Sequence, residues 1–348
     1  MCRPGWDRPL PPLPPAAQAG LDSRVGDVTT VRWGIAGPGR MAAVMTEAFA
    51  EVPQGEVVAV GSRSLDRAQA FAAEHGIPRA HGSYDALVTD PEIDAIYIAT
   101  PHPQHTEIAL AAIAAGKPIL VEKAFTATLA DTERVIESAR AAGVFAMEAM
   151  WTRFNPAIAH ARRIIADGEI GELRGVQGDL TAFRPFDPDD RLFDPALGGG
   201  AVLDLGVYVL SFAQHFLGTP DVVHAVGGSF PTGVEGEFGV LLGYRDGRSA
   251  TLSGGFTAYG PGRMMLLGTQ GWIDVHPRFH RSPSLTVWRG KTPEHLTFPG
   301  GYQYEIAHVG ECLAAGRTES PVMPLDDTIA VQRLMADVLG QVRAYAAG

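Results

Sequence analysis

The stretch GIAGPGRMA, which begins at residue 34, constrains the fold of this chain more than any other feature of its sequence. Gly37, Gly39 and Ala42 match the pattern G-x-G-x-x-G/A. In that pattern the first glycine permits a tight turn, the second lets backbone approach a pyrophosphate, and the small third residue lets helix and strand pack closely. An apolar run precedes the stretch and an amphipathic segment follows it. The pattern therefore predicts a strand, a turn and a helix whose N-terminus faces a dinucleotide.

Strand-like and helix-like segments alternate from residue 31 to residue 150. The runs VRWGIAG, EVVAVGS, AIYIAT and PILVE are typical of buried strands, and the amphipathic segments between them are typical of helices. Ser64 is placed to cap one of these helices, and Gly76 and Gly116 to end two of them. We expect an α/β Rossmann domain over residues 31–150, with a doubly wound parallel sheet.

The pattern changes after residue 150. Short strand-like runs are broken by Gly, Pro and Asp, and Asp246-Gly247 between two apolar runs predicts a hairpin. The segment GGGAVLDLGVYVLSFAQHFLG predicts an inserted helix, and the end of the chain predicts an amphipathic helix. We expect residues 151–348 to form an α+β domain with an open, mainly antiparallel sheet.

The proline-rich residues 1–30 are expected to form a disordered arm outside the fold. The net charge of −11 argues against a nucleic-acid-binding protein. No apolar run approaches the ~20 residues that span a bilayer, so no membrane partner is expected. The two cysteines, Cys2 and Cys312, suggest neither a disulfide framework nor a metal site, which fits the cytoplasm.

The end of the second predicted strand bears on the choice of dinucleotide. An acidic residue there would bind the ribose hydroxyls of NAD. This chain instead has Ser62 and Arg63, with Arg67 one helical turn further on, and both types of side chain can bind a 2′-phosphate. The alternative is an ordinary polar loop. The sequence favours NADP(H), with NAD(H) the less favoured cofactor, and Arg40 and Met41 at the helix start are also expected to contact it.

Two later strands end in polar residues. One is followed by Thr100, Pro101 and, further on, His105, and the other ends in Glu122 and Lys123. In doubly wound sheets ligands bind beyond the carboxyl ends of the strands, so all five residues are expected at the cofactor cleft. A solvated strand end is the alternative for Lys123. His105 either contacts the cofactor ribose or only begins a helix.

Several stretches resemble one known family of enzymes. The segments GIAGPGRMA, TPHPQH, VEKA, GGGAVLDLGVY and GTQGWIDV are similar to those of the glucose–fructose oxidoreductase/inositol dehydrogenase family (Gfo/Idh/MocA). The resemblance covers nearly the whole chain from residue 31 to the C-terminus. The segments MEAMWTRFNP and HPQH most resemble the branch that contains dimeric dihydrodiol dehydrogenase and D-xylose dehydrogenase.

The resemblance implies a catalytic lysine at Lys123, an aspartate at Asp204 and an acid/base tyrosine at Tyr208. Ala124 departs from the family pattern, which has proline after the lysine. A tyrosine titrates near pH ~10, and a neighbouring cation such as Lys123 would bring its pKa toward neutrality. Asp204 and Tyr208 are four residues apart, hence on one face of a helix, where Asp204 would hold substrate or orient Lys123. The alternative is that Asp204 caps a turn and Tyr208 fills the core.

Trp151, Arg153 and Phe154 follow the last strand of the first domain. They either wall the substrate pocket together with Asp204 and Tyr208 or pack between the domains. Pairs of histidines occur, but without an accompanying set of carboxylates or cysteines, so no metal site is expected.

These features predict an NADP-dependent oxidoreductase that transfers a hydride between nicotinamide and a secondary or anomeric hydroxyl of a sugar, cyclic polyol or trans-dihydrodiol. A sugar–sugar oxidoreductase, a redox-assisted lyase or glycosidase with a tightly held cofactor, and a non-catalytic NADP(H)-binding sensor are the alternatives. The family resemblance also implies a homodimer, or a homotetramer, assembled through the sheet of the second domain.

Overall fold

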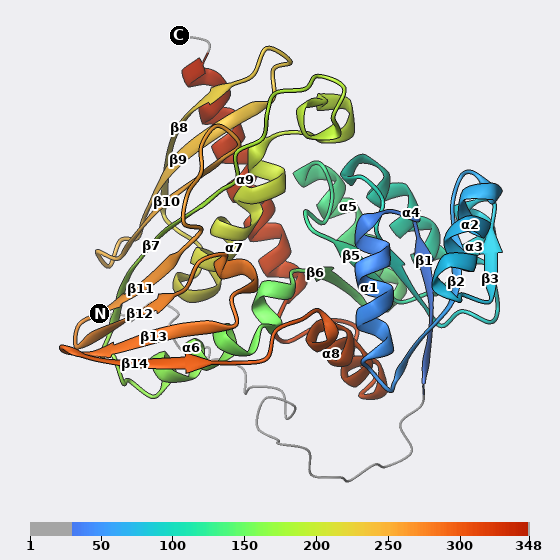
Figure 1. The fold of residues 1–348 in the computed structure, drawn as a ribbon, viewed down its shortest axis with the longest axis horizontal. Helices are drawn as coiled ribbons and strands as arrows, with labels where there is room; N and C mark the ends of the chain where they lie inside the picture. Colours follow the sequence, from blue (N-terminus) through green and yellow to red (C-terminus); the bar gives the residue numbers. More distant parts are fainter. Residues whose placement is uncertain (1–29, 347–348) are drawn as a thin grey trace.

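The computed structural model describes residues 30–346, which form two sheets with helices between and around them (Figure 1). The expected arm at residues 1–30 lies outside this range, apart from Thr30. One sheet has six strands and the other eight. The structure thus has the expected combination of a Rossmann-like sheet and a second, mainly antiparallel sheet.

The six-stranded sheet is parallel throughout and has the strand order β3-β2-β1-β4-β5-β6. Because the order reverses between β1 and β4, a crevice opens there at the carboxyl ends of the strands. Its strands are β1 (Val31–Ala36), β2 (Gly55–Gly61), β3 (Arg79–His81), β4 (Ala95–Ile98), β5 (Ile119–Glu122) and β6 (Ala146–Ala149). Its helices are α1 (Arg40–Ala50), α2 (Leu65–His75), α3 (Tyr84–Val88), α4 (His102–Ala114) and α5 (Leu129–Ala142).

Local signals in the sequence set the ends of these helices. The Ser64 hydroxyl accepts a hydrogen bond from the backbone N–H of Arg67 at 3.4 Å, which caps α2 as predicted. Gly76 ends the same helix in the left-handed conformation at φ 69°. These local choices place the start of α2, and with it Arg63 and Arg67, at the end of β2.

The eight-stranded sheet has the order β14-β13-β12-β11-β7-β10-β9-β8, and only the β7–β10 pair is parallel. The predicted hairpin is confirmed: β9 pairs with β10 around Gly247, which has φ 82°. The strands are β7 (Leu173–Thr181), β8 (Val222–Ser229), β9 (Glu235–Gly243), β10 (Ser249–Gly255), β11 (Met264–Gly268), β12 (Gly271–Val275), β13 (Ser284–Arg289) and β14 (Thr292–Thr297).

Helices α7 and α9 lie between the two sheets, with α9 running along β8 (Figure 1). The predicted inserted helix begins with a turn of π-helix, Val202–Gly206, which continues into α7 (Val207–Leu217). Such π-helical turns are frequent at functional sites. The other helical elements of this half are η2 (Trp151–Phe154), α6 (Pro156–Ala166), η3 (Arg191–Phe193), η4 (Pro195–Leu197), η6 (Phe279–Arg281), α8 (Gln303–Ala314) and α9 (Leu325–Ala346).

Among the described residues, Pro195–Leu217 is long and apolar enough to cross a membrane by length and composition. However, 78% of its most apolar window is buried inside the protein, as in the core helix of a globular protein. Hydrophobic burial against the two sheets therefore accounts for its composition.

Candidate active site

A cavity of about 860 Å³ opens at the carboxyl ends of the parallel strands and is closed on its other side by segments of the second half of the chain. Most of the residues predicted from the sequence lie in its wall. Those residues are Gly37, Gly39, Arg40, Met41, Ser62, Arg63, Arg67, Thr100, Pro101, Glu122, Lys123, Trp151, Asp204 and Tyr208. The other three, His105, Arg153 and Phe154, are not among the residues that line it.

The glycine turn fits a dinucleotide. Gly37 has φ 100°, and a Cβ atom added to it would lie 2.7 Å from Cγ2 of Thr100. Gly39 precedes α1, and a Cβ added there would meet no atom within 4 Å. No side chain caps this helix, and its first turn carries no acidic residue. The N–H groups and the positive end of the helix dipole therefore face the cavity, where a pyrophosphate would bind.

The end of β2 adds positive charge to the same part of the cavity. Ser62 is buried, whereas Arg63 and Arg67 are exposed and form no ion pair with any residue of the range 30–346. Tyr84 lines the same cavity, where burial raises the pKa of its hydroxyl and the charges of Arg63 and Arg67 oppose that rise. Ser62, Arg63 and Arg67 are of the right types to hold a 2′-phosphate.

The end of β5 presents Glu122 and Lys123 to the cavity. One oxygen of the buried Glu122 carboxyl accepts a hydrogen bond from the Tyr97 hydroxyl at 2.6 Å. Burial raises the pKa of Glu122, because the charged form loses solvation. The Nζ atom of Lys123 donates a hydrogen bond of 2.9 Å to the backbone carbonyl of Asp204. The buried strand β5 therefore ends at the wall of the cavity, which Glu122 and Lys123 both line.

Lys123, Asp204 and Tyr208 meet in the cavity. The Lys123 ammonium lies 3.6 Å from Oδ1 of Asp204 and 4.6 Å from the centre of the Tyr208 ring. Arg191 lies on the same carboxylate oxygen, also at 3.6 Å. Burial favours a raised pKa for Asp204, but the charges of Lys123 and Arg191 outweigh it and hold the pKa below its usual value. Asp204 is therefore ionised at neutral pH.

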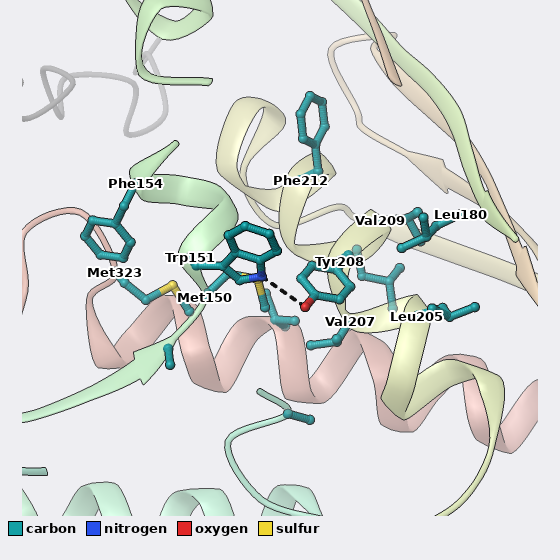
Figure 2. Packing of buried hydrophobic residues seen from close by; sticks show 14 of the residues in the cluster. Met150, Trp151, Phe154, Leu180, Leu205, Val207, Tyr208, Val209, Phe212 and Met323 are labelled. Carbon is teal, nitrogen blue, oxygen red and sulfur yellow. Dashed lines mark hydrogen bonds between the residues drawn. The ribbon is translucent and has the colours of Figure 1, made fainter. Parts of the chain in front are cut away.

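The hydroxyl of Tyr208 accepts a hydrogen bond of 3.1 Å from the indole N–H of Trp151 (Figure 2). Burial and the nearby Glu122 carboxyl raise the pKa of Tyr208 well above its usual value, and the bond from Trp151 only partly offsets this rise. The expectation that Lys123 brings this pKa toward neutrality is therefore wrong. The ammonium lies over the ring face, and the tyrosine keeps its proton at neutral pH.

His105 is held away from the cavity by two backbone carbonyls. Its Nε2 lies 2.6 Å from the Thr100 oxygen and its Nδ1 lies 3.1 Å from the Phe125 oxygen, and the side chain is fully buried. These contacts leave no ring nitrogen for a cofactor ribose, so His105 fixes the start of α4 instead. His102 lines the cavity, and its Nε2 lies 3.2 Å from the carbonyl oxygen of Lys123.

Arg153 and Phe154 pack inside the second half of the chain. The Arg153 guanidinium donates to Asp327 at 2.6 Å and to Gln214 at 2.6 Å, and it is almost fully buried. Phe154 packs on the ring of His308 with the centroids 5.0 Å apart. Figure 2 shows Phe154 and Tyr208 on opposite sides of Trp151. Of the three residues expected to wall the pocket, only Trp151 does so.

Sequence reasoning missed six charged or aromatic residues that the second half of the chain contributes to the cavity wall. Tyr302 stacks on Trp151 with the ring centroids 4.0 Å apart, and His280 lies against the Tyr208 ring at 4.9 Å. The loops of this half also contribute arginines. No motif surrounds any of these positions, because they come from loops far apart in the sequence. The six residues are Arg184, Arg191, Arg278, His280, Arg281 and Tyr302.

Two family models match the chain. Residues 31–150 match the oxidoreductase family with an NAD-binding Rossmann fold, and residues 158–274 match the GFO/IDH/MocA C-terminal domain. The chain belongs to the GFO/IDH/MocA family of oxidoreductases. Its relatives and structural neighbours are named dehydrogenases, reductases and oxidoreductases, in agreement with an NAD(P)-dependent enzyme.

The chain is similar to trans-1,2-dihydrobenzene-1,2-diol dehydrogenase of Bos taurus, with 36% identity over 90% of this chain and 96% of the bovine protein. The human enzyme of the same name is 35% identical over the same shares. Among solved structures, a 3-ketoreductase from Actinomadura kijaniata in complex with NADP and TDP-benzene has a TM-score of 0.80 at 26% identity, covering 90% of this chain and 98% of that one. An aldose-aldose oxidoreductase from Caulobacter crescentus, complexed with glycerol, has a TM-score of 0.83 at 25% identity over the same shares.

Proposed function

We propose that this member of the GFO/IDH/MocA family is an NADP-dependent oxidoreductase that acts on a secondary or anomeric hydroxyl of a sugar, cyclic polyol or trans-dihydrodiol. The observation that carries the proposal is the convergence of Lys123, Asp204 and Tyr208 in the cavity that the glycine turn opens into. The names of its relatives, which act on a dihydrodiol, on a keto group or on aldoses, support this range of substrates.

The nicotinamide, when bound, supplies or accepts the hydride. Tyr208 is the residue that exchanges a proton with the reacting oxygen of the substrate. Because the Trp151 indole N–H donates to the Tyr208 oxygen, the tyrosine O–H is free to point at a substrate oxygen. With its raised pKa, Tyr208 is protonated at neutral pH and suited to donate a proton to a carbonyl that is being reduced.

The Lys123 ammonium stabilises negative charge that develops on the reacting oxygen. Asp204 holds Lys123 in place through its backbone carbonyl and its carboxylate. In the oxidation direction Tyr208 accepts the substrate proton only after it has lost its own, so its raised pKa confines oxidation to alkaline pH. Asp204 is charged and within the cavity, so it also accepts hydrogen bonds from a second substrate hydroxyl.

Preference for NADP(H) over NAD(H) follows from the end of β2. Arg63 and Arg67 are unpaired within residues 30–346, and Ser62 lies beside them, so a 2′-phosphate gains charge-assisted hydrogen bonds there. The complex of the Actinomadura kijaniata reductase with NADP supports the same choice.

A panel of neutral and acidic polyols and aldoses and of trans-dihydrodiols, followed by the absorbance of NADPH, tests the proposal. We expect NADP⁺ to be reduced with at least one ring compound that carries adjacent hydroxyls, and more efficiently than NAD⁺. A purified protein that binds NADPH yet leaves every member of the panel unchanged in both directions would support the sensor alternative instead.

A second candidate is a sugar–sugar oxidoreductase that keeps its cofactor through successive turnovers. The likeness to the aldose-aldose oxidoreductase favours it. Cofactor that copurifies with the protein and is not exchanged for added labelled NADP⁺ during turnover identifies this mode. Rapid exchange of the label argues against it.

We further propose the domain division at residues 31–150 and 151–348, and a homodimer formed through the eight-stranded sheet. The family matches at residues 31–150 and 158–274 support the division.

Val222, Val226 and Leu241 are each about half exposed, on the face of β8 and β9 opposite to α9, and a partner subunit would cover them. The low cysteine content, two residues in 348, supports a cytoplasmic location.

A further inference from the structure

Four arginines from the second half of the chain line the cavity around the catalytic residues. Arg184 follows β7 and Arg191 begins a short 3₁₀ turn, while Arg278 precedes and Arg281 ends the 3₁₀ turn before β13. Arg184 and Arg191 act electrostatically on Asp204, and Arg278 and Arg281 act on His280. Arg191 lies 3.6 Å from Asp204 and His280 lies against Tyr208, so the cavity that these arginines line also holds the proposed reaction site.

These positive charges exceed the negative charges that face them. Arg191 shares the Asp204 carboxylate with Lys123, whereas Arg184, Arg278 and Arg281 form no ion pair with any residue between 30 and 346. The two acidic residues of the cavity wall are Asp204 and Glu122. This local excess of positive charge occurs in a chain whose net charge is −11.

The cofactor does not account for this group of arginines. The phosphate-binding features are the start of α1, Arg63 and Arg67, and all of them belong to the six-stranded half. Those features supply the positive charge that a dinucleotide requires. The arginines of the second half line the same cavity as Asp204, Tyr208 and His280, where the substrate is expected, and their charges act on Asp204 and His280.

The position of Arg278 supports a role in binding. It is the one residue other than glycine with a positive φ among those that the structure describes, at φ 61° and ψ 48°. A conformation of this kind is strained and is concentrated at ligand sites. One of its guanidinium nitrogens donates to the carbonyl of Thr181 at 3.2 Å, which anchors the side chain while its other N–H groups remain available.

We propose that the substrate of this enzyme carries an anionic group, a carboxylate or a phosphate, which Arg184, Arg278 and Arg281 bind while Tyr208 and Lys123 act on a ring hydroxyl or its ketone. The inference rests on the proposed oxidoreductase function and narrows its substrate to acidic sugars and polyols. Arginine suits this task because its planar fork of donors matches the oxygens of a carboxylate or phosphate.

Equilibrium binding to the NADPH-loaded protein tests the inference without depending on turnover. The probes are D-glucose, D-glucuronate and D-glucose 6-phosphate, which share a ring and differ in charge. We expect at least one of the two anions to bind ten times or more as tightly as glucose, with the advantage shrinking as salt is added. The order of the two anions distinguishes a carboxylate from a phosphate.

Two variants test whether the arginines cause the preference for anions over glucose. Arg281→Gln and Arg184→Gln should each lower the ratio of anion affinity to glucose affinity at least fivefold, while NADPH affinity changes less than twofold. Both side chains are exposed, so the fold should be kept. Arg245→Gln, in the β9–β10 hairpin and 90% exposed, is the matched control and should leave the ratio unchanged.

Equal affinity for glucose and for both anions would overturn the inference. So would a loss of NADPH affinity in Arg281→Gln and Arg184→Gln, because the arginines would then serve the cofactor. Anion binding without any turnover would instead contradict the proposed oxidoreductase function and leave the anion site standing.

Discussion

The indole N–H of Trp151 donates a hydrogen bond of 3.1 Å to the hydroxyl oxygen of Tyr208 (Figure 2). The two residues are 57 positions apart in the sequence, on η2 and α7. Trp151 also stacks on Tyr302, so the indole is fixed on both its face and its edge. The bond holds the tyrosine oxygen in place and leaves its proton for substrate.

Trp151→Phe should lower kcat by roughly tenfold, because the Tyr208 hydroxyl loses the donor that orients it. The loss also removes an influence that lowers the pKa of Tyr208, so the pH profile of the oxidation reaction should move to higher pH. Steady-state kinetics across pH provide the measurement, and NADPH affinity is expected to stay within about twofold. An unshifted profile with wild-type kcat would remove the indole from the mechanism.

Gly37→Ala should mainly lower the stability of the fold, whereas Gly39→Ala should mainly weaken NADPH binding. A Cβ at position 37 meets the Thr100 side chain on strained backbone, so Gly37→Ala should lower the free energy of unfolding by about 1–3 kcal/mol. A Cβ at position 39 meets nothing, so Gly39→Ala should keep the melting temperature yet weaken NADPH binding at least tenfold. Gly340→Ala, in open space on α9, is the control: it should leave NADPH affinity unchanged and should not lower the free energy of unfolding, because alanine favours the helix. Full NADPH affinity in Gly39→Ala would place the pyrophosphate elsewhere.

Arg63→Ala should weaken NADPH binding by about tenfold or more and NADH binding by less than twofold, because only NADPH carries the 2′-phosphate. Fluorescence titration of both nucleotides measures the difference. Arg134→Ala, on α5 outside the cavity and paired with Glu107, should alter neither affinity. Equal losses of affinity for the two nucleotides would show that Arg63 does not bind the 2′-phosphate.

Glu148→Gln should change stability in a pH-dependent way. Glu148 is buried, its carboxyl accepts a hydrogen bond from the Phe125 N–H at 3.0 Å, and burial raises its pKa to about 7 from 4.5. The folded chain therefore holds this proton more tightly than the unfolded chain. Protonation of Glu148 therefore stabilises the fold fully below about pH 4.5. This stabilisation, on the order of 3 kcal/mol, is lost as the pH rises to about 7.

The glutamine introduced by Glu148→Gln would keep an oxygen for the Phe125 N–H and carry no charge. The melting temperature of this variant should therefore exceed that of the wild type at pH 8 and lose that advantage at pH 5. Thermal unfolding at the two pH values provides the test. Glu74→Gln, on the exposed side of α2, should show no such pH dependence. A variant less stable than wild type at pH 8 would contradict the assignment.

The architecture was predictable because its signals are local and periodic. The glycine turn, the cap at Ser64 and the hairpin at Gly247 each act within a few residues, and the structure confirms all three. The short edge elements β3 and α3 were missed, because a three-residue strand and a five-residue helix are too short for periodicity to register.

The candidate site was predictable only where it is carried by motifs at strand or helix ends. Lys123 and Tyr208 follow such motifs, whereas Arg278, Arg281 and Tyr302 reach the cavity from loops whose direction depends on the tertiary fold. Burial likewise could not be read from sequence. His105 and Arg153 are residue types that often bind ligands. In this structure His105 instead hydrogen-bonds two buried backbone carbonyls, and Arg153 hydrogen-bonds the carboxylate of Asp327.

The rate of hydride transfer in Tyr208→Phe, measured in a single turnover with NADPH already bound, is the most direct test of the catalytic assignment. We expect a decrease of roughly 10²–10⁴-fold, the contribution of a positioned acid/base group, with NADPH affinity and melting temperature close to wild type. A single-turnover rate equal to that of the wild type would contradict the account, because the proton would then be handled elsewhere.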